Sequence, residues 1–188
     1  MRKLNLEDLK SDNAETKYHC AKQAIALSEK NPKGLYPQLK VFTKLLDGEN
    51  RVLKWVAIII IGNLARADAK SQIDRLVPKL IGFLKGKEMI TANNAIMALG
   101  KIAASKPKFK GKIFQAFLGV EKAVYYNKGQ VSPECRNIAL GKALEVFSLF
   151  KTDVQKSSVL LAFIGRQVRN SRPATGRKAR VLLKAFKP

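Results

Sequence analysis

The chain has 188 residues, of which 46% are hydrophobic and 27% are charged, and its 36 Lys and Arg outnumber its 14 Asp and Glu, giving a formal net charge of +22. A hydrophobic fraction of this size is enough to build a packed core, which excludes a disordered chain or a fibre. The longest apolar run, residues 55–62, is far shorter than the ~20 residues that a membrane span needs. We therefore expect one soluble folded domain with no membrane partner.

The first residues and the cysteines indicate the compartment. Met1, Arg2 and Lys3 lead into polar and acidic residues rather than into the apolar core of a signal peptide. Cys20 and Cys135 are far apart, and each lies in a run typical of a helix, so the sequence suggests neither a disulfide framework nor a four-ligand metal site. We expect a cytoplasmic protein without a metal or a cofactor.

Apolar residues recur at spacings of three and four along the chain, as in Leu76, Leu80 and Phe83, and the alternation typical of strands is missing. This period predicts amphipathic helices. Residues rich in Asn, Gly and Pro, such as 31–34 and 127–129, separate the helical runs and predict turns. In chain order, we expect helices near residues 14–30, 35–46, 52–67, 72–85, 91–105, 109–126, 133–150, 154–169 and 174–186.

Three of these helices share a short pattern around a glycine. Gly62, Gly100 and Gly141 occupy equivalent places in it, and they lie 38 and then 41 residues apart. A glycine inside a helix costs ~1 kcal/mol relative to Ala, so we expect neighbouring helices to approach closely at these points.

A second pattern lies between the glycines. Residues 35–39 read Leu-Tyr-Pro-Gln-Leu, and residues 76–80, which begin 41 positions later, read Leu-Val-Pro-Lys-Leu. Two interleaved signals with one period indicate a repeated unit of two helices.

A period near 40 with paired helices and a small residue in the first helix resembles the HEAT repeat family. The pattern is carried by Ala57, Ile61, Gly62, Leu64, Ala95, Leu99, Gly100, Ile102, Leu140, Gly141 and Leu144. The first unit departs from it, with Ala24 and Leu27 but no glycine. Armadillo-like and other helical-pair repeats fit the same pattern.

The resemblance implies an all-α fold, a right-handed α-solenoid of about four helical pairs and a C-terminal capping helix. It also implies that residues 1–188 form a single repeat domain whose second helices line a concave face.

The charge is concentrated toward the C-terminus. Residues 1–50 hold nine basic and seven acidic residues, a net charge of +2, whereas residues 51–188 hold twenty-seven basic and seven acidic residues, a net charge of +20. No acid follows Asp153, so residues 154–188 form a strongly basic segment. Intracellular polyanions are chiefly nucleic acids, and these are the expected partner of such a surplus.

A phosphate oxygen needs only a cation or an N–H donor within hydrogen-bond distance, so basic residues on the second helices and in the C-terminal segment are the candidates. Arg166, Arg169 and Arg172 recur at a spacing of three and are expected on one side of a helix end. The predicted nucleic-acid-binding residues are Lys79, Lys85, Lys106, Lys108, Lys110, Lys112, Arg166, Arg169, Arg172, Arg177, Lys178 and Arg180.

Tyr125 and Tyr126, beside Lys128, have two interpretations. They are able to stack on an exposed base, or they pack locally at the end of a helix.

Three functions fit these observations. The first is a non-enzymatic helical-repeat protein that binds the phosphate backbone of DNA or RNA without strong sequence readout. The second is a HEAT-repeat scaffold whose groove holds an acidic protein partner. No small-molecule substrate is evident under either hypothesis.

The third hypothesis is an enzyme that excises alkylated bases, because the chain is similar in size and charge to HEAT-like DNA glycosylases. Those enzymes use an Asp and tryptophans on the concave face, whereas Trp55 is the only tryptophan here and is expected to pack between repeats. Asp68 lies close to it in sequence, and Asp74 is expected to cap the next helix. The motifs GxxxxGK[ST], GxGxxG and HExxH are absent, so we assign no catalytic residue.

Overall fold

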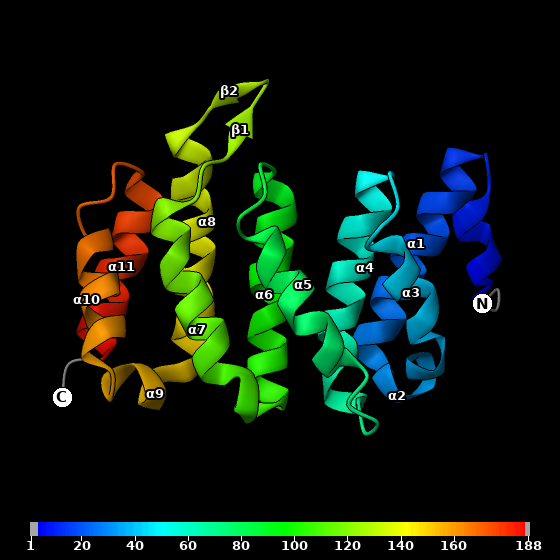
Figure 1. Ribbon diagram of the computed structural model, residues 1–188, viewed down its shortest axis with the longest axis horizontal. Coiled ribbons are helices and arrows are strands. Elements are labelled where there is room, and N and C mark those ends of the chain that lie inside the picture. Colours follow the sequence, from blue (N-terminus) through cyan, green and yellow to red (C-terminus); the bar gives the residue numbers. More distant parts are fainter. Residues whose placement is uncertain (1–3, 187–188) are drawn as a thin grey trace.

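The computed structural model describes residues 4–186, and the all-α prediction is confirmed because helices form most of this range (Figure 1). One row of long helices consists of α1 (Ala14–Lys30), α4 (Arg51–Leu64), α6 (Met89–Ser105), α8 (Pro133–Phe147) and α11 (Pro173–Phe186). A second row consists of shorter helices, namely α2 (Pro32–Leu35), α3 (Leu39–Leu45), α5 (Val77–Phe83), α7 (Lys110–Leu118), α9 (Lys151–Gln155) and α10 (Ser158–Gln167). None of the described helices is long and apolar enough to cross a membrane.

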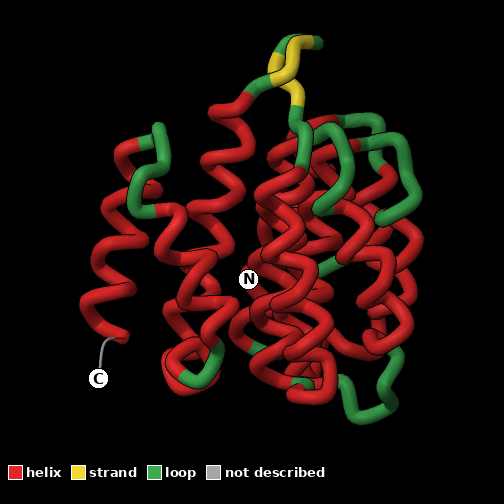
Figure 2. Tube along the Cα trace, turned by 60° about the vertical axis from the view of Figure 1, so that its left-hand side comes forward, coloured by secondary structure: helices red, strands yellow, loops and turns green. Residues whose placement is uncertain are grey.

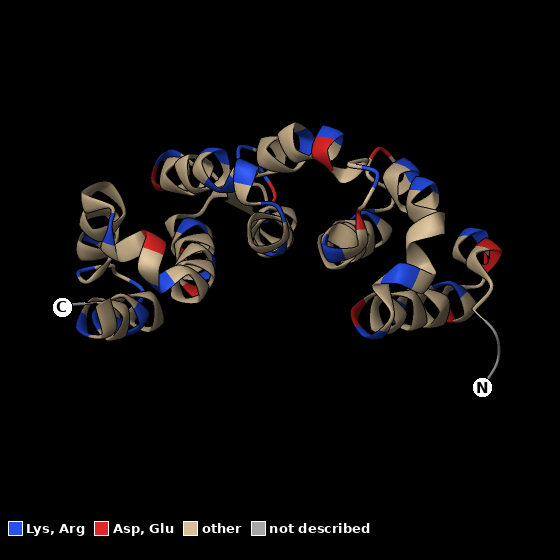
Figure 3. Ribbon diagram, turned by 90° about the horizontal axis from the view of Figure 1, so that it is seen from below, with Lys and Arg blue, Asp and Glu red and all other residues tan. Residues whose placement is uncertain are grey.

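Viewed along the helices, the two rows follow a common arc (Figure 3). The long helices, which correspond to the predicted first helices, lie on the inner side of this arc, and the shorter second helices lie on the outer side. The expectation that the second helices line the concave face is therefore wrong. We call the long helices the inner row and the shorter helices the outer row.

Polar caps fix where most of the long runs begin. The side chains of Asn13, Asn50 and Ser132 accept hydrogen bonds from the backbone N–H groups of the first turns of α1, α4 and α8. Ser157 does the same for α10. A side-chain oxygen at this position satisfies an N–H that has no partner within the helix, which is why these residues begin helices.

The outer-row elements are less regular than predicted. A 3-10 segment, Tyr36–Gln38, precedes α3, and further ones, Ile73–Leu76 and Pro107–Phe109, precede α5 and α7. Proline lies at the start of several of these elements, where its missing N–H breaks no helical hydrogen bond. The helix expected at 154–169 is divided into α9 and α10.

Residues 109–126 also differ from the prediction, because the helix ends early and a small hairpin follows. α7 passes into a 3-10 turn at Gly119–Lys122, and strands β1 (Tyr126–Asn127) and β2 (Gln130–Val131) then pair antiparallel. The hairpin projects beyond the ends of the helices (Figures 1 and 2). It was missed because strands of two residues leave no measurable alternation in the sequence.

The core lies between the two rows. Its C-terminal half contains an aromatic cluster in which Phe147 of α8 meets Phe114 and Phe117 of α7 and Phe163 of α10 edge to face, with ring centroids 5.3 to 5.8 Å apart. Such edge-to-face pairs add ~0.5–1.5 kcal/mol to the burial of their apolar area. The cluster therefore joins the inner row to the outer row.

The repeated glycines mark close contacts between successive inner helices, rather than within a pair. A Cβ atom at Gly62 of α4 would lie 2.7 Å from the Cα atom of Ala98 in α6. A Cβ atom at Gly100 of α6 would lie 2.7 Å from a methyl group of Val146 in α8, and the same holds for Gly141 against Thr175 of α11, at 2.9 Å. A larger residue at Gly62 would therefore meet the backbone of the next helix, whereas at Gly100 and Gly141 it would meet side-chain atoms, the hydroxyl oxygen of Thr175 in the case of Gly141.

Replacing Gly100 by Leu should lower the free energy of unfolding by ~1–3 kcal/mol, because the added side chain overpacks the contact between α6 and α8. Urea unfolding measures the change. Gly111→Leu is the matched control, since a Cβ at Gly111 of α7 meets nothing within 4 Å. Equal stability of the two variants would contradict the close contact.

Candidate nucleic-acid interface

All acidic side chains of residues 51–188 form ion pairs within the protein. From Asp68 onward each acidic residue forms an ion pair with a Lys or Arg; these residues are Asp68, Asp74, Glu88, Glu121, Glu134, Glu145 and Asp153. Among residues 51–186, the Lys and Arg side chains outside these pairs outnumber those within them. The surplus of positive charge is therefore displayed as cations without an acidic neighbour.

More than half of the predicted binding residues form an ion pair with an acid of the chain. Lys79 pairs with Asp47 and Arg172 with Glu134. The other predicted residues in ion pairs are Lys106, Lys108, Lys110, Arg166 and Lys178. Within the described part of the chain, Lys85, Lys112, Arg169, Arg177 and Arg180 have no acidic partner, and the guanidinium of Arg180 donates to the backbone oxygen of Val168 at 3.1 Å.

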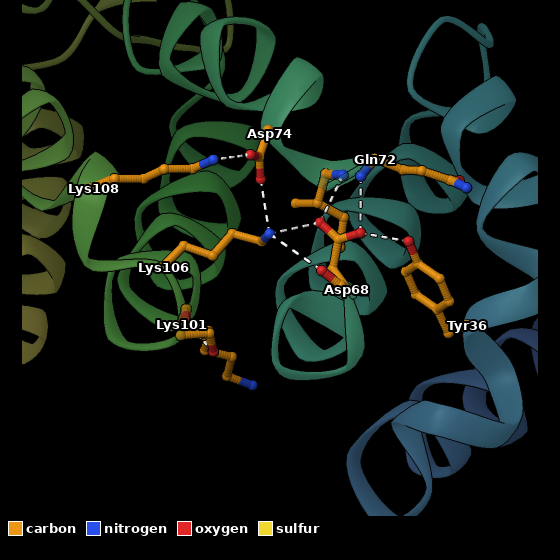
Figure 4. Close-up of polar contacts among 9 residues, drawn as sticks. Tyr36, Asp68, Gln72, Asp74, Lys101, Lys106 and Lys108 are labelled. Atoms are coloured by element: carbon orange, nitrogen blue, oxygen red, sulfur yellow. Dashed lines mark hydrogen bonds and ion pairs between the residues drawn. The ribbon is translucent and has the colours of Figure 1, made fainter. Parts of the chain in front are cut away.

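Lys106 has the most structural role of the predicted residues. Its side chain is only 10% exposed, and its Nζ lies 2.9 Å from Asp68 Oδ2 and 2.8 Å from Asp74 Oδ1 (Figure 4). Lys108, whose side chain is 61% exposed, pairs with the other oxygen of Asp74. Lys106 therefore joins the loop before α7 to the loop before α5, and its charge is directed into the protein.

The buried carboxylate of Asp68 organises the same loops. It accepts hydrogen bonds from the Tyr36 hydroxyl and, at 2.9 Å each, from the backbone N–H groups of Gln72 and Ile73 (Figure 4). Asp68 thus caps the segment that begins at Ile73. The expectation that Asp74 provides the cap is wrong, because Asp74 binds lysines instead.

These contacts determine the protonation of the group. Burial acts to raise the pKa of Asp68, but the hydrogen bonds from Tyr36, Lys106 and the two backbone N–H groups outweigh it and lower the pKa. Burial, reinforced by the adjacent Asp68, raises the pKa of Tyr36 to about 12. At neutral pH the cluster therefore contains a charged carboxylate that is paired with Lys106 and accepts a hydrogen bond from the neutral phenol of Tyr36.

The predicted lysine group before and within α7 is placed on the outer row. Lys108 pairs with Asp74, and Lys110 pairs with Asp153 at 2.9 Å, which leaves Lys112 as the cation of that group without an acidic partner among residues 4–186. Arg166 and Arg172 pair with separate carboxylates, Glu121 and Glu134. Four of the predicted cations, Lys108, Lys110, Arg166 and Arg172, are therefore each paired with a carboxylate of the chain itself.

The inner row carries the predicted residues Arg177 and Lys178 and further cations that were not predicted. A hollow between α1, α4 and α6 is lined by Glu29, Asn63, Arg66 and Lys101. A second hollow, between α8 and α11, is lined by Glu145, Arg177 and Lys178, and Lys142 reaches the same Glu145 at 2.7 Å. Both hollows are lined mainly by residues of the inner row, which forms the concave side of the arc (Figure 3). We call Arg66, Lys101, Lys142, Arg177 and Lys178 the inner-face cations. Lys142 and Lys178 share the single carboxylate of Glu145, so positive charge exceeds negative charge at the second hollow.

Hydrogen bonds also connect the inner helices at this level. The amide nitrogen of Asn63 donates to Ser28 Oγ of α1 at 2.8 Å, and Lys101 of α6 donates to the amide oxygen of Asn63. Asn63, Lys101 and Lys142 each directly follow a repeat glycine. This repeated position is the sequence signal from which Lys101 and Lys142 were identifiable.

Trp55 lies at the contact between α4 and α6, as expected for a residue that packs between repeats. Its indole N–H donates to Thr91 Oγ1 at 2.8 Å, and Thr91 in turn donates to Glu88 at 2.9 Å. Glu88 is paired with Arg51. These contacts assign the indole a role in joining the two helices.

Residues 4–186 contain no group of three or more His, Cys, Asp and Glu side chains placed to hold a metal ion. Comparison of the chain with protein-family models, with curated proteins and with solved structures gave no match.

Replacing Lys106 by Met should lower the free energy of unfolding by ~3–5 kcal/mol, because the buried carboxylate of Asp68 loses its cationic partner. Lys108→Met is the control, since this exposed lysine binds the same cluster and should cost less than ~1 kcal/mol. Urea unfolding at neutral pH compares the two variants. A larger loss for Lys108→Met would show that the buried pair is not the stabilising contact.

The lowered pKa of Asp68 also predicts a dependence on pH. The ionised carboxylate stabilises the fold above the unfolded-state pKa of about 4, and this contribution is lost as the pH falls through the lower pKa of the folded state. The difference in unfolding free energy between wild type and Asp68→Asn should therefore shrink as the pH is lowered from 7 to 3. A difference that stays constant over this range would contradict the assignment.

Proposed function

We propose that the chain is a right-handed α-solenoid of the HEAT type, with about four helical pairs and a capping C-terminal helix, that binds nucleic acid without catalysing a reaction. Two observations support the HEAT-like assignment. The repeat signals share one period near 40 residues, and the inner helices pack closely at Gly62, Gly100 and Gly141. In this assignment the inner row forms the concave surface and α11 closes its C-terminal end.

One observation supports nucleic acid as the partner above the others. Every acidic residue from Asp68 onward is held in an ion pair, while a larger number of Lys and Arg side chains in residues 51–186 are left over. A surface of this kind repels itself unless a polyanion or counterions neutralise it. Release of counterions from phosphates provides the corresponding free energy of binding.

The binding surface that we propose consists of the inner-face cations together with the basic C-terminal segment, residues 154–188. Arg177 and Lys178 belong to both, which makes the C-terminal end of the concave face its most basic part. Such contacts to phosphates position a nucleic acid and do not read its sequence.

Replacing Lys101, Arg177 and Lys178 together by Gln should weaken binding to every sequence alike and should reduce the slope of log K against log salt by up to about 0.9 per lost contact on duplex DNA. The control replaces the outer-row residues Lys108, Lys110 and Lys112 by Gln, which removes the same charge. The inner-face variant should lose more affinity. Fluorescence anisotropy of labelled oligonucleotides, measured over a range of salt concentrations, gives both quantities.

Equal losses for the two triple variants would show that net charge matters and the concave face does not. Absence of binding to any oligonucleotide at about 50 mM salt, where electrostatic contacts are strong, would favour the alternative of an acidic protein partner.

A further inference from the structure

The two neighbouring tyrosines at the start of the hairpin lie in opposite environments. Tyr125 is fully buried, and its hydroxyl donates to the backbone oxygen of Leu84 at 2.8 Å. Tyr126 is 38% exposed and forms the first residue of β1. Tyr125 therefore anchors the hairpin to the core, whereas Tyr126 is displayed by it.

Backbone hydrogen bonds fix the base of the hairpin, and the residues beyond the base are exposed. The backbone N–H of Tyr126 donates to the oxygen of Lys87 at 3.0 Å, and that of Ser132 donates to the oxygen of Tyr125 at 2.8 Å. Lys128 and Gly129 form the tight turn, with φ angles of +50° and +80°. All residues from Tyr126 to Val131 are exposed, and the hairpin extends past the helices (Figure 2). Its outer part therefore adds no side chain to the core.

One lysine lies beside the exposed ring, and the hairpin segment itself carries only positive charge. The Nζ of Lys87 lies 5.5 Å from the centroid of the Tyr126 ring, and residues 122–133 contain Lys122 and Lys128 but no acidic residue. The acids that flank the hairpin are each held by an arginine, in the pairs Arg51 with Glu88, Arg166 with Glu121 and Arg172 with Glu134.

We propose that this hairpin is an arm that contacts unpaired bases: Tyr126 stacks on a base of a single strand while Lys87 and Lys128 bind the adjoining phosphates. An aromatic ring beside cations is the combination that single-stranded nucleic acids bind, and it tolerates any base because every base presents a π face. Bases inside a duplex are already stacked on one another, so this contact favours single strands. The inference rests on the proposed nucleic-acid binding and adds that the protein prefers single-stranded nucleic acid to a duplex.

The test measures the binding of a labelled single-stranded oligothymidylate and of a labelled duplex of equal length to wild type and to Tyr126→Ala. Loss of the ring should weaken single-strand binding about 5- to 150-fold, the range that base–aromatic stacking covers. Duplex binding should change less than about twofold, because contacts to phosphates remain. Tyr126→Phe, which keeps the ring, should bind the single strand like wild type.

Tyr18→Ala provides the matched control. Tyr18 is 37% exposed, nearly as much as Tyr126, but it lies on α1 beside Glu15 and away from the hairpin. Its loss should leave binding to both oligonucleotides unchanged. Circular dichroism and thermal unfolding of both Ala variants check that each is folded.

Two results separate this inference from the proposed function. In the first, wild type binds the duplex, and Tyr126→Ala either binds the single strand like wild type or loses affinity for both oligonucleotides equally. This result would contradict the role of the hairpin but not the proposed binding of nucleic acid. If wild type binds neither oligonucleotide at about 50 mM salt, both fail.

Discussion

The close contact between successive inner helices is the constraint on which the rest of the structure depends. Gly62, Gly100 and Gly141 each face a neighbouring helix at a distance that leaves no room for a Cβ atom. These three positions therefore allow the long helices to approach one another more closely than a larger residue would permit. The outer helices then pack over the grooves that remain, and the aromatic cluster around Phe147 fills the space between the rows. The concave face is a consequence of this packing.

Electrostatics divides the charged residues of the same scaffold into two groups. The few carboxylates after residue 50 act within the protein, as in the cluster of Asp68, Asp74 and Lys106, where each charge has a partner. The remaining cations face outward and repel one another, which lowers stability unless a counter-charge is bound. Ion pairs inside the protein and a binding site on its surface thus use the same residue types. The positions of the few acids determine which lysines and arginines are paired within the protein and which are available to a ligand.

The fold was more predictable from the sequence than the site, for a physical reason. Helical period, caps and repeated glycines are local signals, and they located α1 and α6 within two residues of their observed ends. The ion-pair partner of a lysine, in contrast, depends on tertiary packing. Lys106 and Asp68 are 38 residues apart, and no sequence pattern near either residue predicts their contact. The prediction that the second helices line the concave face was wrong for a similar reason. The repeat period shows that first and second helices alternate along the chain, but it does not show which of them lie on the concave side. The hairpin escaped detection since its strands are too short to alternate.

The cluster around Asp68 has a consequence for the order in which the molecule comes apart. In a row of helices each unit contacts mainly its neighbours, so local opening begins where the links between units are weakest. Tyr36, Asp68 and Lys106 each lie where a long inner helix is connected to the shorter helices that follow it, and their hydrogen bonds and ion pair link these three connections. At the C-terminal end, α11 packs against α8 and α10, and it is tied to α8 by the half-exposed Lys178–Glu145 pair and by one buried hydrogen bond, from the Thr175 hydroxyl to the backbone oxygen of Asn137 at 2.8 Å. We therefore expect the amide hydrogens of α11, which has one inner-row neighbour, to exchange with solvent before those of α4 and α6, which each have two.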